Sequence, residues 1–198
     1  MRTVFQNCTL LDGTEQMSPR PGTDVAIENG KITQIGKIAP NKGDRVVDLT
    51  GKYLMPGLIN LHVHLPAGGK PQNKPMNTNR LTKIALSSGL SRALVLRMCH
   101  AYAMQGLLSG VTTVRAVGGL DNLDTRLRDR IHAGKLDGPR ILAANYAIGV
   151  PHGHMVGSVT HPAETVEDAV RMVDQLHGQN VDLIKLMITG GVMDAKVK

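Results

Sequence analysis

The feature that most constrains this chain is an alternation of short apolar strands with helical segments after Met55. Four apolar runs of about six residues are separated by segments of roughly 10 to 20 residues with helical periodicity. This rhythm is typical of βαβ units and predicts a parallel sheet covered by helices. The predicted strands are Leu58 to His64, Val111 to Val117, Arg140 to Ile148 and Val181 to Ile188.

The predicted helices carry apolar residues at intervals of three or four, which places these residues on one face. The three sets are Leu94, Met98, Ala101, Met104 and Leu108; Leu123, Leu127 and Ile131; and Val166, Val170, Val173 and Leu176. The glycine- and proline-containing stretch from 66 to 90 predicts a long loop after the first strand.

Before this region, residues 3 to 54 are short strands separated by turns. Asn29-Gly30 lies between two apolar runs and predicts a two-residue hairpin turn. We therefore predict an α/β chain with part of a small β-sandwich domain over residues 1–54 and the first half of a (β/α)₈ TIM barrel, strands 1 to 4, over residues 55–198. A complete barrel needs about 250 residues, so its remaining strands are expected beyond Lys198 or from another chain.

The composition argues against a nucleic-acid partner. The 23 Lys and Arg exceed the 16 Asp and Glu, giving a net charge of +7. The basic residues are nevertheless scattered, and three Tyr and one Phe offer few rings for base stacking. The densest basic group, Lys70, Lys74, Arg80 and Lys83, is explained by a solvated loop.

The two cysteines, Cys8 and Cys99, match no metal or redox spacing, so we expect free thiols and a reducing compartment. The N-terminus lacks the apolar core of a signal peptide, and no run approaches the roughly 18 apolar residues of a membrane span. A cytoplasmic protein with no membrane association is expected.

The strongest chemical signal is Leu61-His62-Val63-His64 at the end of the first predicted strand. Because strand side chains alternate, Asn60, His62 and His64 share one face, and the two imidazoles are separated by about 7 Å along the strand. Both can then reach one divalent metal. The alternative is that one histidine packs in the core and the other caps a loop, but the aliphatic opposite face favours the metal site.

Lys185, in VDLIKLMITGG, is the second signal, because alternation directs it inward with Leu183 and Met187. A desolvated lysine loses its charge more readily, and a neutral amine reacts with carbon dioxide to give a carbamate, an anionic oxygen ligand able to bridge two metals. An ion pair with a nearby carboxylate is the equally weighted alternative.

Four ordered segments, MPGLINLHVH, LLSGVTTVRAVGG, DGPRI and DLIKLMITGG, resemble motifs of the amidohydrolase superfamily, in its imidazolonepropionase-like and Xaa-Pro dipeptidase-like branch. The resemblance covers nearly the whole chain. It implies a divalent metal pair, usually zinc, with His62 and His64 as ligands and carbamylated Lys185 bridging both ions. The implied reaction is attack of metal-activated water on a small amide, cyclic amide or dipeptide.

The chain departs from this pattern at two positions, where Asn60 and Ala116 replace carboxylates common in relatives. The resemblance also implies two further histidines from strands five and six and a general-base aspartate from strand eight, all expected beyond residue 198. No catalytic residue is therefore assigned here, and the chain alone is predicted to be inactive. It is expected to act as a homo-oligomer or with a complementary C-terminal half.

His154, in VPHGHMVG, matches a Gly-Gly-His loop of relatives in which Gly153 is retained. It is a candidate substrate contact as well as a candidate solvated loop residue. His152 replaces a glycine of that loop. Surface roles are expected for the remaining histidines, His100, His132, His161 and His177. Arg115 is expected to pair with a neighbouring strand rather than with a substrate carboxylate.

Overall fold

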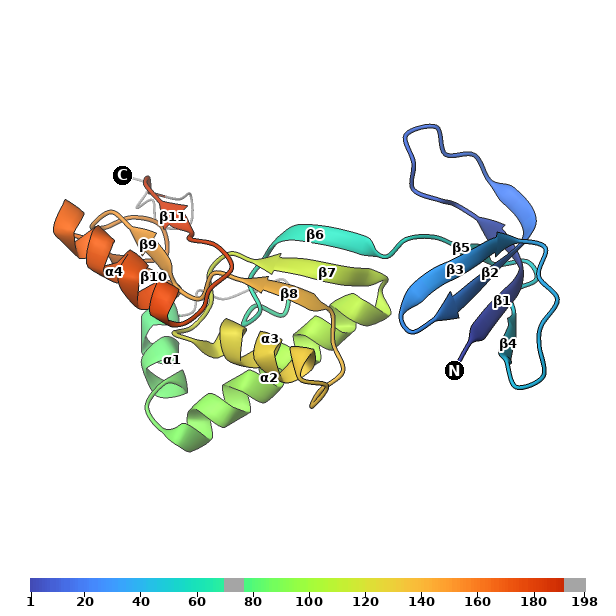
Figure 1. Ribbon diagram of the computed structural model, residues 1–198. Helices are drawn as coiled ribbons and strands as arrows, with labels where there is room; N and C mark the ends of the chain where they lie inside the picture. The colour runs from blue at the N-terminus through green and yellow to red at the C-terminus, as the bar shows by residue number, and fades with distance from the viewer. Residues whose placement is uncertain (70–76, 191–198) are drawn as a thin grey trace. The chain divides into compact units, whose positions relative to one another are not determined.

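The computed structural model describes residues 1–69 and 77–190, and the chain divides into two compact units. Unit 1 comprises Met1–Gly57 and unit 2 comprises Leu58–Lys198 (Figure 1).

Unit 1 is a five-stranded sheet in the order β3-β2-β1-β4, with β5 also pairing with β1. Its strands are β1 (Thr3–Leu10), β2 (Arg20–Glu28), β3 (Lys31–Gly36), β4 (Arg45–Asp48) and β5 (Tyr53–Leu54). The predicted Asn29-Gly30 hairpin is confirmed: Glu28 pairs with Lys31, and both turn residues have positive φ. The buried side chains of β1 and β2 form the small apolar clusters of this unit.

Unit 2 begins with a parallel sheet in the order β6-β7-β8, formed by Leu58–Val63, Val111–Ala116 and Arg140–Ala143. Helices α2 (Gly89–Leu108) and α3 (Leu123–His132) lie on one face of this sheet (Figure 1). Alternate strand residues such as Val114 and Ile141 point toward these helices and pack against Leu96, Leu123 and Leu127. The first three predicted strands and the helices α2 and α3 thus contribute to this core. The apolar face predicted for α2 was wrong, because its buried residues are Leu96, Cys99 and Ala103, whereas Leu94 and Leu108 are exposed.

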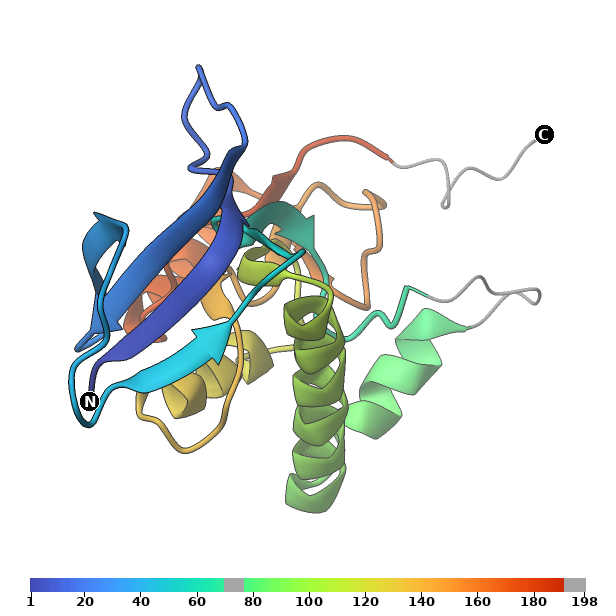
Figure 2. The same cartoon turned by 90° about the vertical axis from the view of Figure 1, so that its right-hand side faces the viewer.

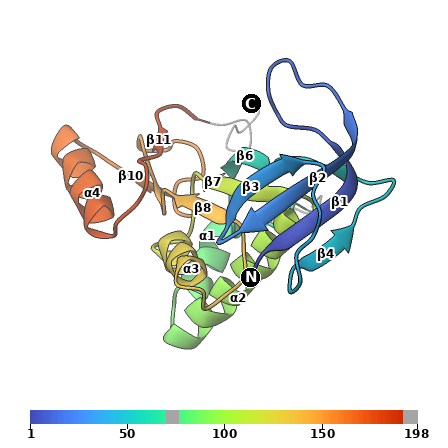
Figure 3. The ribbon, with the colours of Figure 1, turned by 45° about the vertical axis from the view of Figure 1, so that its right-hand side comes forward.

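A second parallel sheet, in the order β10-β9-β11, continues unit 2. It comprises β9 (Ala147–Gly149), β10 (Thr160–Pro162) and β11 (Leu186–Met187), with α4 (Val166–Gly178) packed beside it through Leu176 (Figure 3). The prediction of one continuous third strand was wrong. Buried Asn145, with φ of 58°, separates β8 from β9, because a left-handed residue turns the chain away from the strand direction.

The prediction of a long loop over residues 66 to 90 was also wrong in part. Helix α1 (Thr78–Ala85) forms there, capped by the Asn77 side chain, and lies beside α2 (Figure 2). Lys70 and Lys74 of the predicted basic group lie outside the described residues. Helix α2 starts at Gly89, where Ser88 and Ser91 form a capping box, a common signal for the start of a helix.

The predicted aliphatic face of β6 is only partly covered. Val63 packs against the core, whereas Ile59 and Leu61 are 64% and 53% exposed. The predicted fourth strand, Val181 to Ile188, was wrong in its extent, because only Leu186–Met187 forms a strand, β11. In this fourth-strand segment Ile184 packs beside α4, while Leu186 and Ile188 are exposed. Among the described residues, β6 and β11 each have a strand neighbour on one side only, and the pairing of β6 with β7 shifts register between Leu58 and Ile59 and between Asn60 and Val63.

Cys8 and Cys99 are both free and buried, as expected from their spacing. Among the helices of the described residues, none combines the length and apolar character that a membrane crossing requires.

Candidate metal centre

His62 in β6 and His64, one residue beyond its end, lie together at the carboxyl end of the strand. The ring centroids of His62 and His64 are 5.4 Å apart, and the rings meet edge to face. The strand places them so because residues two apart project from the same side. Two imidazoles at this separation present nitrogen ligands to a common space.

His64 is oriented by a main-chain oxygen. Its Nδ1 atom lies 2.8 Å from the carbonyl oxygen of Gly118, just beyond β7. Because a carbonyl oxygen only accepts, Nδ1 carries the hydrogen and donates, which leaves the lone pair of the neutral ring on Nε2. This is the tautomer in which a histidine is ready to bind a metal through Nε2.

Gly118 permits this contact because it has no side chain. Its φ is 143°, and a Cβ atom there would lie 3.0 Å from the His64 ring. Residues with a side chain rarely adopt such a φ. The adjacent Val117 amide donates to the Val63 carbonyl, so that the loop is tied to β6 directly before His64. Sequence reasoning did not identify Gly118, although the Gly-Gly pair after a predicted strand was visible.

Lys185 approaches the histidines from the fourth strand. Burial, followed by the positive charge of Lys185, lowers the pKa of His62, and His64 and Arg115 act in the same direction. The structure therefore brings Lys185 into the electrostatic range of His62, which stays neutral more readily than a free imidazole. Lys185 itself is half-buried rather than enclosed.

Arg115 pairs with a neighbouring strand, as expected: its Nε donates to the Leu61 carbonyl at 2.7 Å. The cationic groups of Arg115 and Lys185 thus both act on His62. Such a concentration of positive charge favours an anionic group among them.

The two departures from the family pattern lie in different places. Asn60 turns toward its own strand and accepts from the His62 amide at 3.1 Å. Ala116 is fully buried in the core beneath α2 and α3, because it projects from the helix-covered face of β7. A side chain at position 116 therefore lies in the core with Val114 and Ile141.

His154 lies in the loop after β9. Its amide donates to the carbonyl of Thr189, which follows β11, so the loop lies near the carboxyl end of the fourth strand. Gly153 is buried, whereas His152 is exposed and keeps a left-handed φ of 57° at the position of the replaced glycine. His154 is thus held on the side where parallel barrels place their binding groups.

Surface positions are confirmed for His132 and His177 but not for the other two histidines. His161 is half-buried and stacks on Tyr146 with ring centroids 4.1 Å apart, and burial lowers its pKa against the opposing charge of Asp121. His100 is half-buried and its Nε2 lies 2.8 Å from the Asp137 carbonyl. Packing between strands and helices, invisible to a local pattern, covers both residues.

Within residues 1–69 and 77–190, no three His, Cys, Asp or Glu side chains come together in a metal-ligand arrangement. The candidate centre of this part of the chain consists of His62, His64 and Lys185. Two imidazoles fit a divalent metal, and Lys185 would complete the set as a ligand once it carries an anionic oxygen.

Comparisons with known proteins agree with this architecture. The profile described as the Amidohydrolase family matches residues 53–198. Over 156 residues, the chain is 31% identical to an imidazolonepropionase from Pseudomonas putida, in an alignment that covers 76% of this chain and 35% of that protein. The matched segments span well under half the length of such curated relatives.

Among solved structures, an amidohydrolase is 27% identical and superposes with a TM-score of 0.80, covering 98% of this chain and 48% of its own. A Xaa-Pro dipeptidase with bound methionine is 26% identical, with a TM-score of 0.73, and covers 97% of this chain and 48% of its own. The chain thus spans about half of each structure. The predicted fold class is confirmed, a mixed α/β chain that corresponds to part of an amidohydrolase TIM barrel. Its matched residues, four motifs and fold show that the chain belongs to the amidohydrolase family.

Proposed function

We propose that the chain forms the metal-binding N-terminal half of a hydrolase that cleaves C–N bonds in small amides, cyclic amides or dipeptides. The single observation that carries the proposal is the convergence of His62 and His64, with His64 held by Gly118 so that Nε2 is free to bind. The names of an imidazolonepropionase and a Xaa-Pro dipeptidase among the similar proteins support this range of substrates.

In this proposal His62 and His64 bind one divalent ion, zinc in the first instance, and carbamylated Lys185 links it to a second ion. When bound, such metals lower the pKa of water and polarise the substrate carbonyl. The Arg115 guanidinium, which acts on His62 together with Lys185, supports an anionic carbamate at this position. His154 is proposed to contact the substrate, because its loop lies at the carboxyl end of the fourth strand, the end that carries the active site in parallel barrels.

The metal site is tested by titrating zinc against a chromophoric chelator in competition with the chain. His62→Ala and His64→Ala are each expected to weaken zinc binding by roughly 100-fold or more, because loss of a ligand costs more than loss of its supporting contact. His177→Ala, in an exposed part of α4, is the matched control and should bind as the unaltered chain does. Equal zinc affinity in all four proteins would refute the site.

We also propose that residues 1–54 are part of a β-sandwich domain and that residues 55–198 are half of the hydrolase barrel. The exposed strand residues Ile59 and Leu61 support completion of the barrel by further strands, supplied by a complementary C-terminal half or by a second copy of this chain. A general base is proposed to come with those strands. The free thiols of Cys8 and Cys99 support a reducing compartment such as the cytoplasm.

A further inference from the structure

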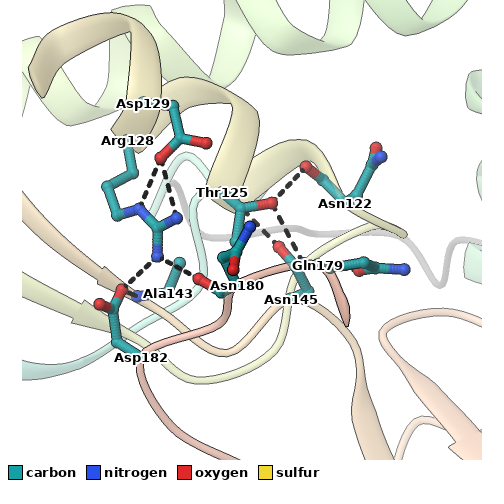
Figure 4. Close-up of polar contacts among 9 residues, drawn as sticks. All are labelled: Asn122, Thr125, Arg128, Asp129, Ala143, Asn145, Gln179, Asn180 and Asp182. Atoms are coloured by element: carbon teal, nitrogen blue, oxygen red, sulfur yellow. Dashed lines mark hydrogen bonds and ion pairs between the residues drawn. The ribbon is translucent and has the colours of Figure 1, made fainter. Parts of the chain in front are cut away.

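At the start of the fourth-strand segment, Asp182 makes two hydrogen bonds to Ala143 of β8 (Figure 4). Its amide donates to the Ala143 carbonyl at 2.9 Å, and its carboxylate Oδ2 accepts from the Ala143 amide at 2.8 Å. Ala143 is buried and is the last residue of β8. Buried main-chain groups require hydrogen-bond partners, and Asp182 supplies the partner of both the amide and the carbonyl of Ala143. Here a carboxylate takes the place that a main-chain carbonyl occupies in a regular ladder.

Arg128 of α3 holds this carboxylate in place. Its guanidinium donates through one nitrogen to Asp182 Oδ2 at 2.6 Å and to the Asn180 carbonyl at 2.8 Å (Figure 4). The Arg128 side chain is 14% exposed and that of Asp182 is 33% exposed. Water therefore screens this ion pair less than it screens a fully exposed one. The segment that enters the fourth strand is bound to both β8 and α3.

The second attachment of the strand lies beyond Lys185. The Lys185 carbonyl accepts from the Ile148 amide at 2.9 Å, and Leu186 and Met187 pair with Ile148 and Gly149. This regular ladder is only two residues long, and a short ladder specifies register weakly. A shift by one residue would turn every side chain, including that of Lys185, to the opposite face.

We propose that Asp182 and Arg128 form a positioning pair that sets the register of the fourth strand and thereby directs Lys185 toward His62. The use of Lys185 as a metal ligand rests on the proposed function, whereas its placement by the pair does not. Asp182 lies three residues before Lys185, and the two attachments at Ala143 and Ile148 bracket the segment between them. Neither member of the pair needs to touch substrate.

The placement is tested by NMR on the metal-free chain. Asp182→Ala is expected to remove the cross-strand nuclear Overhauser contact between Ile148 and Leu186, or to move it by one residue. It should also speed hydrogen exchange of the Ile148 amide roughly tenfold relative to that of Val114 in β7. Asp182→Asn keeps an acceptor for the Ala143 amide and should restore part of the protection. A purely global loss of stability would speed exchange at Val114 equally.

The matched control is Asp129→Asn, because Asp129 also pairs with Arg128 but its side chain is 61% exposed and reaches no strand. This variant should retain the Ile148–Leu186 contact. If Asp182→Ala fails to fold, Arg128→Met serves instead, since it keeps an unbranched side chain but removes the nitrogen that donates to both Asn180 and Asp182. An unchanged cross-strand contact in the folded variant would overturn the proposal.

A second experiment measures the zinc content of the unaltered chain and of the variants by elemental analysis, after incubation with zinc and bicarbonate. Asp182→Ala should lose as much zinc as Lys185→Ala, while the ion bound by the histidine pair remains. Full zinc content in Asp182→Ala would overturn the positioning role and leave the proposed function intact. If the unaltered chain takes up no zinc, the proposed function fails, and the NMR result alone decides whether the pair positions the strand.

Discussion

Asp124 is a carboxylic acid enclosed in the core of unit 2, on the first turn of α3. It is 1% exposed, and neither carboxyl oxygen has a hydrogen-bond partner among the described residues. Burial raises its pKa to about 7. Its neighbour Gly119 has no room for a side chain, since a Cβ atom there would overlap the Asp124 carboxyl group. Position 119 must therefore be glycine to leave room for the Asp124 carboxyl group. No local sequence pattern indicates that this carboxyl group is buried.

We expect Asp124 to make the stability of the chain pH-dependent. Its folded pKa of about 7 exceeds the ordinary value of 3.8, so its protonated form favours folding at low pH. This stability is lost as the pH rises through the folded pKa, with a slope of up to about 1.4 kcal/mol per pH unit between the two values. Asp124→Asn should abolish the slope, whereas Asp174→Asn, at an exposed carboxylate, should not. Urea unfolding at a series of pH values measures this; parallel pH profiles of Asp124→Asn and the unaltered chain would contradict it.

At the residue scale, the sequence predicted the His62–His64 pair because strand alternation depends only on neighbouring residues. It did not predict the Gly118 carbonyl that orients His64, because a main-chain acceptor has the same chemistry in every residue type. Nor did the motif tell which face of β7 the helices cover, and hence that Ala116 lies in the core.

At the scale of elements, Asn145 explains why the predicted third strand is two strands. Its side chain accepts from the Thr125 amide at 3.1 Å and donates to Gln179 Oε1 at 2.8 Å, joining α3, the strand break and the entry to the fourth strand (Figure 4). Apolar periodicity predicted the strands on both sides. It could not predict the break, which depends on contacts with residues 20 and 34 positions away.

Asn145→Ala is expected to destabilise the chain by about 2 to 4 kcal/mol, because it leaves a buried amide without an acceptor and places alanine in a left-handed conformation. Asn180→Ala is the matched control, since Asn180 has a similar φ of 55° but is exposed. Asn180→Ala should therefore lower the free energy of unfolding by only about 1 kcal/mol, the cost of placing alanine in a left-handed conformation. Chemical denaturation midpoints compare the two, and equal losses would show that the Asn145 hydrogen bonds contribute little.

At the scale of the whole molecule, unit 2 carries apolar side chains on strands that lack a neighbour on one side among the described residues. Ile59 of β6 is 64% exposed and Ile188, after β11, is 74% exposed. The order of four motifs predicted this half-barrel and its family, since each motif follows from local residues. The sequence did not predict how far the edge side chains would be exposed, because that depends on which strands and helices pack around them.

We expect the chain to self-associate as its concentration rises, because unpaired strand edges recruit other edges. Ile59→Lys should shift this association to higher concentration by placing a charge on the edge strand. Leu90→Lys is the control, since Leu90 is 75% exposed on α2, away from any strand edge. Sedimentation velocity across a concentration series measures the shift. A chain that stays monomeric throughout, or equal effects of both substitutions, would contradict the expectation.

The contact between His64 and the Gly118 carbonyl has an evolutionary consequence. An orienting group that belongs to the backbone cannot be deleted by exchanging a side chain, so substitutions elsewhere in the loop after β7 leave it in place. Position 118 itself admits no Cβ atom without crowding the imidazole. The orientation of the His64 ring therefore depends on the path of the main chain after β7 and not on the chemistry of a side chain that could be exchanged.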